Sequence, residues 1–149
     1  MKLPLTLTMA LAAGSVPIAS PGAEQRFTCP ARLAPETVQR NAPPPGWVLH
    51  MPRGVRLTEG GMLHGPADAS GYMVPDDTKF TKSGLSSIQT DHWIFPQPEG
   101  YPTWIYCGYG GAGAPLQLFK RVADDTTQCT LTSKTKDGIG KETAVFICK

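Results

Sequence analysis

The fold of this chain is decided by residues 126–149, TTQCTLTSKTKDGIGKETAVFICK. Two runs in this stretch, 126–133 and 143–148, are rich in the β-branched and apolar side chains that favour strands. Between them stands Asp137-Gly138, a strong signal for a hairpin turn. The stretch therefore predicts two antiparallel strands joined by a turn.

The two cysteines of this hairpin, Cys129 and Cys148, are expected to pair. Opposed residues of an antiparallel pair share a constant sum of positions, so the two are opposed if the turn centres just after Gly138. A tight Asp137-Gly138 turn instead places them on a diagonal of one face. Residues directly opposed across two strands lie close enough for a disulfide, whereas residues on a diagonal lie farther apart and fit disulfide geometry less well. We favour Cys129–Cys148, which leaves Cys29 and Cys107 to join the first strand to a later one, although four cysteines permit three connectivities.

The rest of the chain also reads as short strands separated by turns. Strands are predicted at 27–33, 47–51, 55–58, 88–95, 103–109 and 116–122, and a helical turn or two at 34–37. Glu59-Gly60-Gly61 is expected to turn the chain, and residues 65–82 are expected to form a long loop. The predicted fold is mainly β, a small antiparallel sheet, sandwich or barrel-like domain with at most one short helix, stapled by two disulfides.

Composition excludes several classes of protein. The chain has 149 residues, 14 Lys+Arg and 12 Asp+Glu, a balance too even for nucleic-acid binding driven by counterion release. Its 16 Gly and 15 Pro follow no three-residue period, which excludes collagen, and their density breaks helices. At 40% hydrophobic residues, the chain is also unlike a charge-expanded disordered protein.

Residues 1–23 have the pattern of a Sec signal peptide: a positive charge, an uncharged apolar stretch and then small residues. The apolar stretch is too short to span a bilayer as a helix. We expect cleavage after Ala23, which leaves 24–149 as a single periplasmic domain. Arg26-Phe27-Thr28 precedes the first cysteine where lipid attachment requires a small residue, so we expect no lipoprotein or other membrane anchor.

Cysteine usage predicts disulfides and no metal. Four cysteines in an exported chain are typical of two disulfides. Zinc is the weaker interpretation, because the chain has no Cys-x-x-Cys motif and His50, His64 and His92 stand apart from the cysteines. We expect no metal and no organic cofactor.

Two adjacent acidic pairs, Asp76-Asp77 and Asp124-Asp125, are the first candidates for chemistry. Paired carboxylates bind calcium or hydrolyse glycosides in other proteins. Neither pair has the spaced ligands of a calcium loop, and Asp is a preferred turn residue. Solvated turns are therefore the favoured interpretation.

His92, between Asp91 and Trp93, is the other candidate for catalysis. Neighbouring side chains on a strand point to opposite faces, so Asp91 cannot easily orient His92. The Gly-rich run 108–113 lacks the Lys-Ser/Thr end of a phosphate-binding loop and precedes a strand. With no catalytic set, we predict a binding protein and not an enzyme.

Aromatic side chains at loop edges are the best candidates for contact with a partner, because they anchor many protein interfaces. The segments 65–82 and 108–115 are expected to project, and Asp76 and Asp77 are expected to steer the complex towards a basic cleft. The predicted partner-binding residues are Tyr72, Asp76, Asp77, Tyr101, Tyr109, Gly110 and Gly111.

A family resemblance follows from the order of several motifs. These are Cys29-Pro30, Pro44-Pro45-Gly46-Trp47, Val74-Pro75-Asp76, Trp93-Ile94-Phe95, Trp104-Ile105-Tyr106-Cys107-Gly108-Tyr109-Gly110-Gly111 and Cys129. The chain resembles, from Cys29 to Cys148, a family of small exported, mostly uncharacterised proteobacterial proteins, some encoded within type VI secretion gene clusters. Trp-x-x-Cys-x-Tyr-Gly-Gly is the most specific block.

The resemblance implies an immunity protein, which binds and blocks a toxin delivered into the periplasm, and it points to toxins that attack peptidoglycan. Two other functions stay open. A periplasmic lysozyme inhibitor shares the size, export and β structure, but only Ser70-Gly71-Tyr72 matches a fragment of its loop signatures. A small secreted hydrolase using Asp76 or Asp77 is the third possibility.

Overall fold

The computed structural model describes residues 23–38, 45, 53–67, 71–95, 100–138 and 140–149. The predicted signal peptide, apart from its last residue, and the predicted strand at 47–51 lie outside the described residues. The described elements are β1 (Gln25–Thr28), β2 (Arg32–Leu33), α1 (Pro35–Val38), β3 (Val55–His64), β4 (Tyr72–Met73), β5 (Asp77–Ser83), β6 (Ser86–Ile94), β7 (Thr103–Tyr109), β8 (Leu116–Arg121), β9 (Gln128–Thr135) and β10 (Lys141–Cys148).

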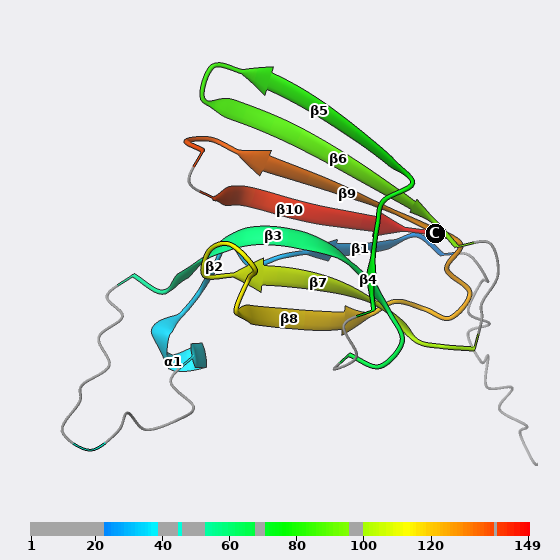
Figure 1. The fold of residues 1–149 in the computed structure, drawn as a ribbon. Coiled ribbons are helices and arrows are strands. Elements are labelled where there is room, and N and C mark those ends of the chain that lie inside the picture. Colours follow the sequence, from blue (N-terminus) through cyan, green and yellow to red (C-terminus); the bar gives the residue numbers. More distant parts are fainter. Residues whose placement is uncertain (1–22, 39–44, 46–52, 68–70, 96–99, 139) are drawn as a thin grey trace, which may run out of the picture.

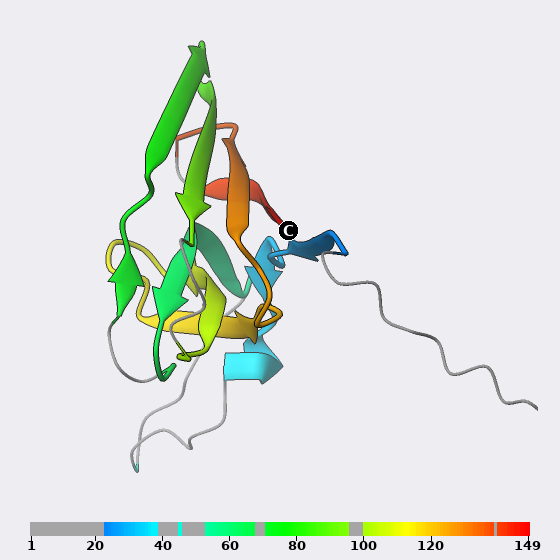
Figure 2. The same cartoon turned by 90° about the vertical axis from the view of Figure 1, so that its right-hand side faces the viewer.

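These strands form two open antiparallel sheets, which confirms the predicted mainly β fold with one short helix (Figure 1). The first sheet has the strand order β1-β10-β9-β6-β5, and the second has the order β2-β3-β7-β8, with β4 paired to β3. Figure 2 shows β5 and β6 extending well beyond the region where the second sheet lies.

The core lies between the two sheets. It consists of Cys29, Leu33, Leu57, Met62, Trp93, Ile105, Cys107, Tyr109, Val122, Cys129, Leu131, Ala144, Phe146 and Cys148. These residues lie in or next to strands of both sheets. The burial of apolar area therefore holds the two sheets together and is not confined to one hairpin.

The β9–β10 hairpin has the opposed register predicted for it. Cys129 pairs directly with Cys148, and the two form a disulfide. The register shifts between Lys141 and Thr143, so Glu142 is an extra residue on β10. That bulge offsets the pairing near the turn from the pairing along the rest of the hairpin.

The second disulfide, Cys29–Cys107, is also confirmed and links the first strand region to β7. The prediction of one strand over 27–33 is wrong. The chain leaves β10 at Cys29, whose N–H donates to the carbonyl of Ala144, and then joins β3 of the other sheet as β2. The disulfide sits at this crossing and staples the two sheets together.

The predicted turn at Glu59-Gly60-Gly61 is wrong, because β3 runs through it without a break. A Cβ at Gly60 would meet Leu131 of the first sheet at 3.4 Å, and one at Gly61 would lie 2.7 Å from the ring of Tyr106. The glycines here serve close packing on both faces of a strand, not a change of direction.

The predicted long loop at 65–82 is also wrong in its second half, where β4 and β5 form. All seven residues of β5 are exposed, and β5 pairs along its whole length with β6. The strand is therefore held by its backbone ladder and not by burial, which explains why its sequence lacks the usual apolar alternation. Among the helices of the described residues, none is long and apolar enough to cross a membrane.

Candidate functional site

A cluster of aromatic side chains covers the outer face of the second sheet. Side chains alternate along β3, so Gly60 faces the first sheet while Gly61 faces away from it, beneath Tyr106. Tyr72 meets Tyr106 edge to face with ring centroids 5.3 Å apart, and Tyr106 lies 6.4 Å from Phe119. We call Tyr72, Tyr106 and Phe119 the aromatic face.

The aromatic face is held in place by polar contacts and close packing. The Tyr72 hydroxyl donates to Gln117 Oε1 at 2.9 Å, although its side chain is 49% exposed. Burial, with smaller contributions from Glu59 and Tyr72, raises the pKa of Tyr106 to about 12. Tyr106 therefore stays neutral at physiological pH and offers a packed ring rather than a base. Edge-to-face pairs of this kind contribute about 0.5–1.5 kcal/mol beyond their buried area.

Tyr101 lies near the same end of β3 as Tyr72. Its ring meets His64 edge to face at 5.8 Å, and His64 follows Leu63, the residue opposite Tyr72. Tyr101 is 64% exposed. Because neighbouring side chains of a strand face opposite sides, these contacts do not place Tyr101 on the aromatic face with Tyr72.

Tyr109 does not belong to this surface, and the prediction that it projects from a loop edge is wrong. Its side chain is fully buried and its hydroxyl donates to the carbonyl of Pro30 at 3.0 Å. Burial raises its pKa to about 12. The signal that could have placed it is its spacing from Cys107: residues two apart share a face, and a cysteine joined to the other sheet must face inward.

Gly110 and Gly111 form the start of the turn between β7 and β8, with positive φ angles of 97° and 113°. The loop is the hairpin connection that the sequence predicts. The Thr58 hydroxyl is within hydrogen-bonding distance of the carbonyls of both Gly108 and Gly111, so the turn folds back onto β3. Both glycines shape a turn, and neither carries a side chain for contact.

Asp76 and Asp77 lie on the first sheet, where β5 begins. A carboxylate oxygen of Asp76 accepts the N–H of Ile94 at 2.7 Å, while Asp77 forms an exposed ion pair with Lys79 at 3.8 Å. Both side chains are exposed. In the part of the chain that the structure describes, no three His, Cys, Asp or Glu side chains gather as metal ligands do.

A buried polar network on the inner face of the first sheet is absent from the sequence predictions. Asp91 is buried and accepts hydrogen bonds from the Thr78 hydroxyl at 2.8 Å and from Gln89 Nε2 at 2.9 Å. Nearby, Lys141 donates to the buried Ser133 hydroxyl at 2.7 Å. Burial lowers the pKa of Lys141, against the opposing attraction of Asp91 and Glu59.

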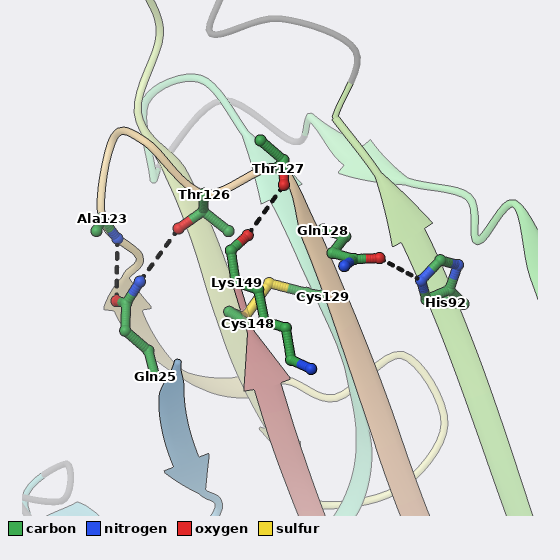
Figure 3. Close-up of a disulfide and its surroundings, with 9 residues drawn as sticks. All are labelled: Gln25, His92, Ala123, Thr126, Thr127, Gln128, Cys129, Cys148 and Lys149. Carbon is green, nitrogen blue, oxygen red and sulfur yellow. Dashed lines mark hydrogen bonds between the residues drawn. A yellow bond between two sulfur atoms is a disulfide. The ribbon is translucent and has the colours of Figure 1, made fainter. Parts of the chain in front are cut away.

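This network does not contain the catalytic pair that Asp91 and His92 suggest. Asp91 faces inward, whereas the His92 ring reaches Gln128 Oε1 at 3.3 Å on the next strand (Figure 3). The two side chains therefore serve opposite sides of β6, as strand alternation predicts. The hydrogen bonds of this network pair the buried polar groups within the sheet, so the network supports the structure.

The Cys129–Cys148 disulfide is surrounded by hydrogen bonds that fix the end of the first sheet (Figure 3). Gln25 of β1 joins the segment before β9, since its amide donates to Thr126 Oγ1 and accepts the N–H of Ala123. Lys149 pairs with the backbone of Gln128 beyond the disulfide. Both sulfurs are buried, which suits a structural bond rather than a redox centre.

One of three comparisons with known proteins identifies a family. A search among curated proteins and a search among solved structures each find no significant match. The family model described as "Type VI secretion system Tli immunity protein" matches residues 51–149. That match covers the second sheet from β3 onward, the protruding β5–β6 hairpin and the C-terminal hairpin. The chain belongs to the type VI secretion system Tli immunity protein family.

Proposed function

We propose that this protein neutralises a toxin in the periplasm by direct binding, and that the aromatic face is its main contact. The observation that carries the proposal is Tyr72, half-exposed yet held by Tyr106 and Gln117 on a disulfide-linked sheet. Membership of the immunity family supports a cognate toxin of a type VI secretion system as the partner.

Preorganisation of Tyr72 lowers the entropy cost of binding. Association costs the entropy of every side chain that becomes ordered, roughly 0.5–1.5 kcal/mol for a side chain with many rotamers. Tyr72 has already lost much of that freedom through its ring contact and its hydroxyl hydrogen bond. An aromatic anchor of this kind is the usual centre of an interface, and contacts around it exclude water. Of the other predicted contacts, we retain the exposed Tyr101, Asp76 and Asp77 as secondary ones.

Inhibition without catalysis is part of the proposal. The buried carboxylate of Asp91 is engaged by Thr78 and Gln89, and the half-buried Lys141 donates to Ser133. We therefore prefer an inhibitor to the alternative of a hydrolase that uses Asp76 or Asp77. A purified chain that degrades peptidoglycan without any partner would reverse that preference.

Binding is tested with the toxin encoded beside the gene for this protein. Tyr72→Ala is expected to raise Kd by about 10- to 100-fold, the size of a hot-spot loss of about 1–3 kcal/mol. Tyr72→Phe, which keeps the ring and loses only the hydroxyl, is expected to have a smaller effect. Val74→Ala is the matched control, because Val74 is 86% exposed and lies two residues further on. Equal affinity for Tyr72→Ala and Val74→Ala would remove the aromatic face from the proposal.

The location is tested in cells. The predicted signal peptide and the two disulfides support action in the periplasm, where disulfides persist. Cells that express the whole chain are expected to survive the toxin sent to the periplasm, and cells that express only 24–149 are expected to die. Equal protection by the two forms would refute periplasmic action.

We also propose peptidoglycan as the substrate of the toxin, on the strength of the sequence resemblance. The assay incubates the toxin with purified cell wall and, separately, with phospholipid vesicles, with and without this protein. Release of cell-wall fragments that the protein suppresses is the expected result. Lipid hydrolysis without cell-wall cleavage would overturn the substrate while leaving inhibition intact.

A further inference from the structure

One end of the first sheet combines two hairpin turns. Thr135 of β9 pairs with Ser87 of β6 and also with Lys141 of β10, so the β5–β6 and β9–β10 turns lie side by side (Figure 1). This end lies away from the disulfide Cys129–Cys148, which is at the other end of the same strands. We call residues 79–87 together with 133–138 and 140–142 the turn end.

Positive charge gathers at the turn end. Its charged side chains are Lys79, Lys82, Lys134, Lys136, Asp137, Lys141 and Glu142. Five lysines thus stand against two carboxylates, although the whole chain has a net charge of only +2. Lys82 and Lys136 are exposed and form no ion pair with any described residue. Their charges are therefore available to a partner.

A groove of about 250 Å³ opens beside two of the five lysines, Lys136 and Lys141. The charged side chains that line it are Arg32, Arg56, Lys136, Asp137, Lys141 and Glu142. Arg56 and Asp137 partly neutralise each other at 3.7 Å, which leaves an excess of cations around a space the size of a few side chains. Such a groove suits carboxylates, which accept charge-assisted hydrogen bonds from Arg and Lys.

Apolar side chains project from the same end. Phe80 of β5 is 62% exposed, and Leu85, in the turn between β5 and β6, is 80% exposed. Gly84, with a φ of 59°, makes this turn possible and places Leu85 at its tip. Because β5 buries none of its seven residues, these side chains contribute little to the core. Exposed apolar groups ringed by charge are typical of protein interfaces.

We propose that the turn end is a second contact surface for the toxin, and that it receives an acidic segment of the toxin with an apolar side chain at its centre. The inference rests on the proposed function and adds the chemistry of the partner. Toxin carboxylates enter the groove beside Lys136, and an apolar group packs on Leu85. We prefer an acidic protein to a lipid surface or a nucleic acid, because the family match supports a protein toxin as the partner and the whole chain is too evenly charged for binding driven by phosphate contacts.

Charge reversal tests the electrostatic part. Lys136→Glu and Lys82→Glu are each expected to lower the association rate constant about 10-fold at low salt and to flatten its dependence on ionic strength. Lys120→Glu is the matched control, since Lys120 is an exposed lysine on β8, away from the turn end. All three lysines are exposed, so thermal melting is expected to stay unchanged. Equal rates for Lys136→Glu and Lys120→Glu would overturn the inference.

Truncation tests the apolar part. Leu85→Ala is expected to raise the dissociation rate constant about 10-fold, with Val74→Ala as the control for loss of an exposed apolar group. If Tyr72→Ala weakens binding while the turn-end variants do not, the inference fails and the proposed function stands. If the wild-type protein does not bind the toxin, both fail. Lys136-dependent co-sedimentation with phosphatidylglycerol vesicles, without a change in toxin affinity, would replace the acidic protein with a lipid and refute the inference.

Discussion

Removing the two disulfides separately is expected to destabilise the protein by different amounts. The variants are Cys29→Ala with Cys107→Ala, and Cys129→Ala with Cys148→Ala. All four sulfurs are buried and each pair closes its own loop, so neither variant leaves a free thiol to pair wrongly. The comparison isolates the effect of loop length, because the chemistry of the two changes is the same.

The magnitudes follow from the sequence separations of 78 and 19 residues. In the chain-entropy model, a cross-link restricts the unfolded chain by an amount that grows with the logarithm of loop length. The long loop gives about 4.5 kcal/mol and the short loop about 3 kcal/mol at 25 °C. The two loops do not overlap in sequence, so the losses are expected to add to about 7.5 kcal/mol. That sum approaches the whole stability of a typical domain, about 5–15 kcal/mol.

Urea unfolding followed by tryptophan fluorescence measures these losses. With a slope of about 2 kcal/mol per molar urea, loss of Cys29–Cys107 is expected to lower the midpoint by about 2 M. Each variant needs its own slope, because an unfolded chain without a cross-link exposes more surface. The variant without both disulfides is expected to be largely unfolded in buffer. An equal or larger loss on removing Cys129–Cys148 would refute the loop-length argument.

Three further predictions concern packing and alkaline pH. Gly61→Ala is expected to lower the unfolding free energy by about 1–3 kcal/mol, because its Cβ would clash with Tyr106. Gly60→Ala makes only ordinary contacts and is expected to lower it less. Parallel thermal melts of the two variants will show the difference. Burial raises the pKa of Tyr109 to about 12, so its contribution to stability is present below pH 10 and declines between pH 10 and 12. Tyr109→Phe is expected to lose part of the phenolate absorbance change near pH 12, while the part that belongs to Tyr106 remains, and an unchanged titration would contradict the assignment. Burial lowers the pKa of Lys141 below 10.5, so the unfolded state binds more protons at this lysine than the folded state, and stability rises with pH up to 10.5. Lys141→Met is expected to flatten that rise in urea titrations at successive pH values. An identical dependence of stability on pH in the variant would contradict the prediction.

The features that could be predicted from sequence are those set by local pairing. The β9–β10 hairpin follows from a turn signal and a constant sum of positions, and the Cys129–Cys148 disulfide follows from that register. The Cys29–Cys107 disulfide then follows by elimination. These inferences need no knowledge of how the two sheets meet.

The errors arise where contacts between distant segments decide the structure. Gly60 and Gly61 resemble a turn, and only the approach of Leu131 and Tyr106 from either side makes them part of a strand. The sequence of β5 resembles a loop because the strand is held by its ladder to β6 and buries nothing. Local patterns carry no information about such partners.

The candidate site was predicted only in part for the same reason. Tyr72 and Tyr101 were expected at the surface and are exposed there, but Tyr109 is buried against Pro30. The companions of Tyr72 come from β7 and β8, more than 30 residues further along the chain. A surface assembled from three strands becomes visible only when the sheet is known.

The pairing of β1 with β10 joins the first and the last strand of the described residues. Gln25 pairs with Cys148 and Thr28 with Val145, so the first sheet joins strands that lie at nearly the greatest separation available in the described chain. Contacts of such high sequence separation must pay the full entropy of loop closure before they gain any stability, and β folds rich in them form in milliseconds to seconds rather than microseconds. A nascent chain that lacks β10 has no partner for β1 and leaves one side of β9 unpaired. Completion of the first sheet therefore requires the last strand of the chain.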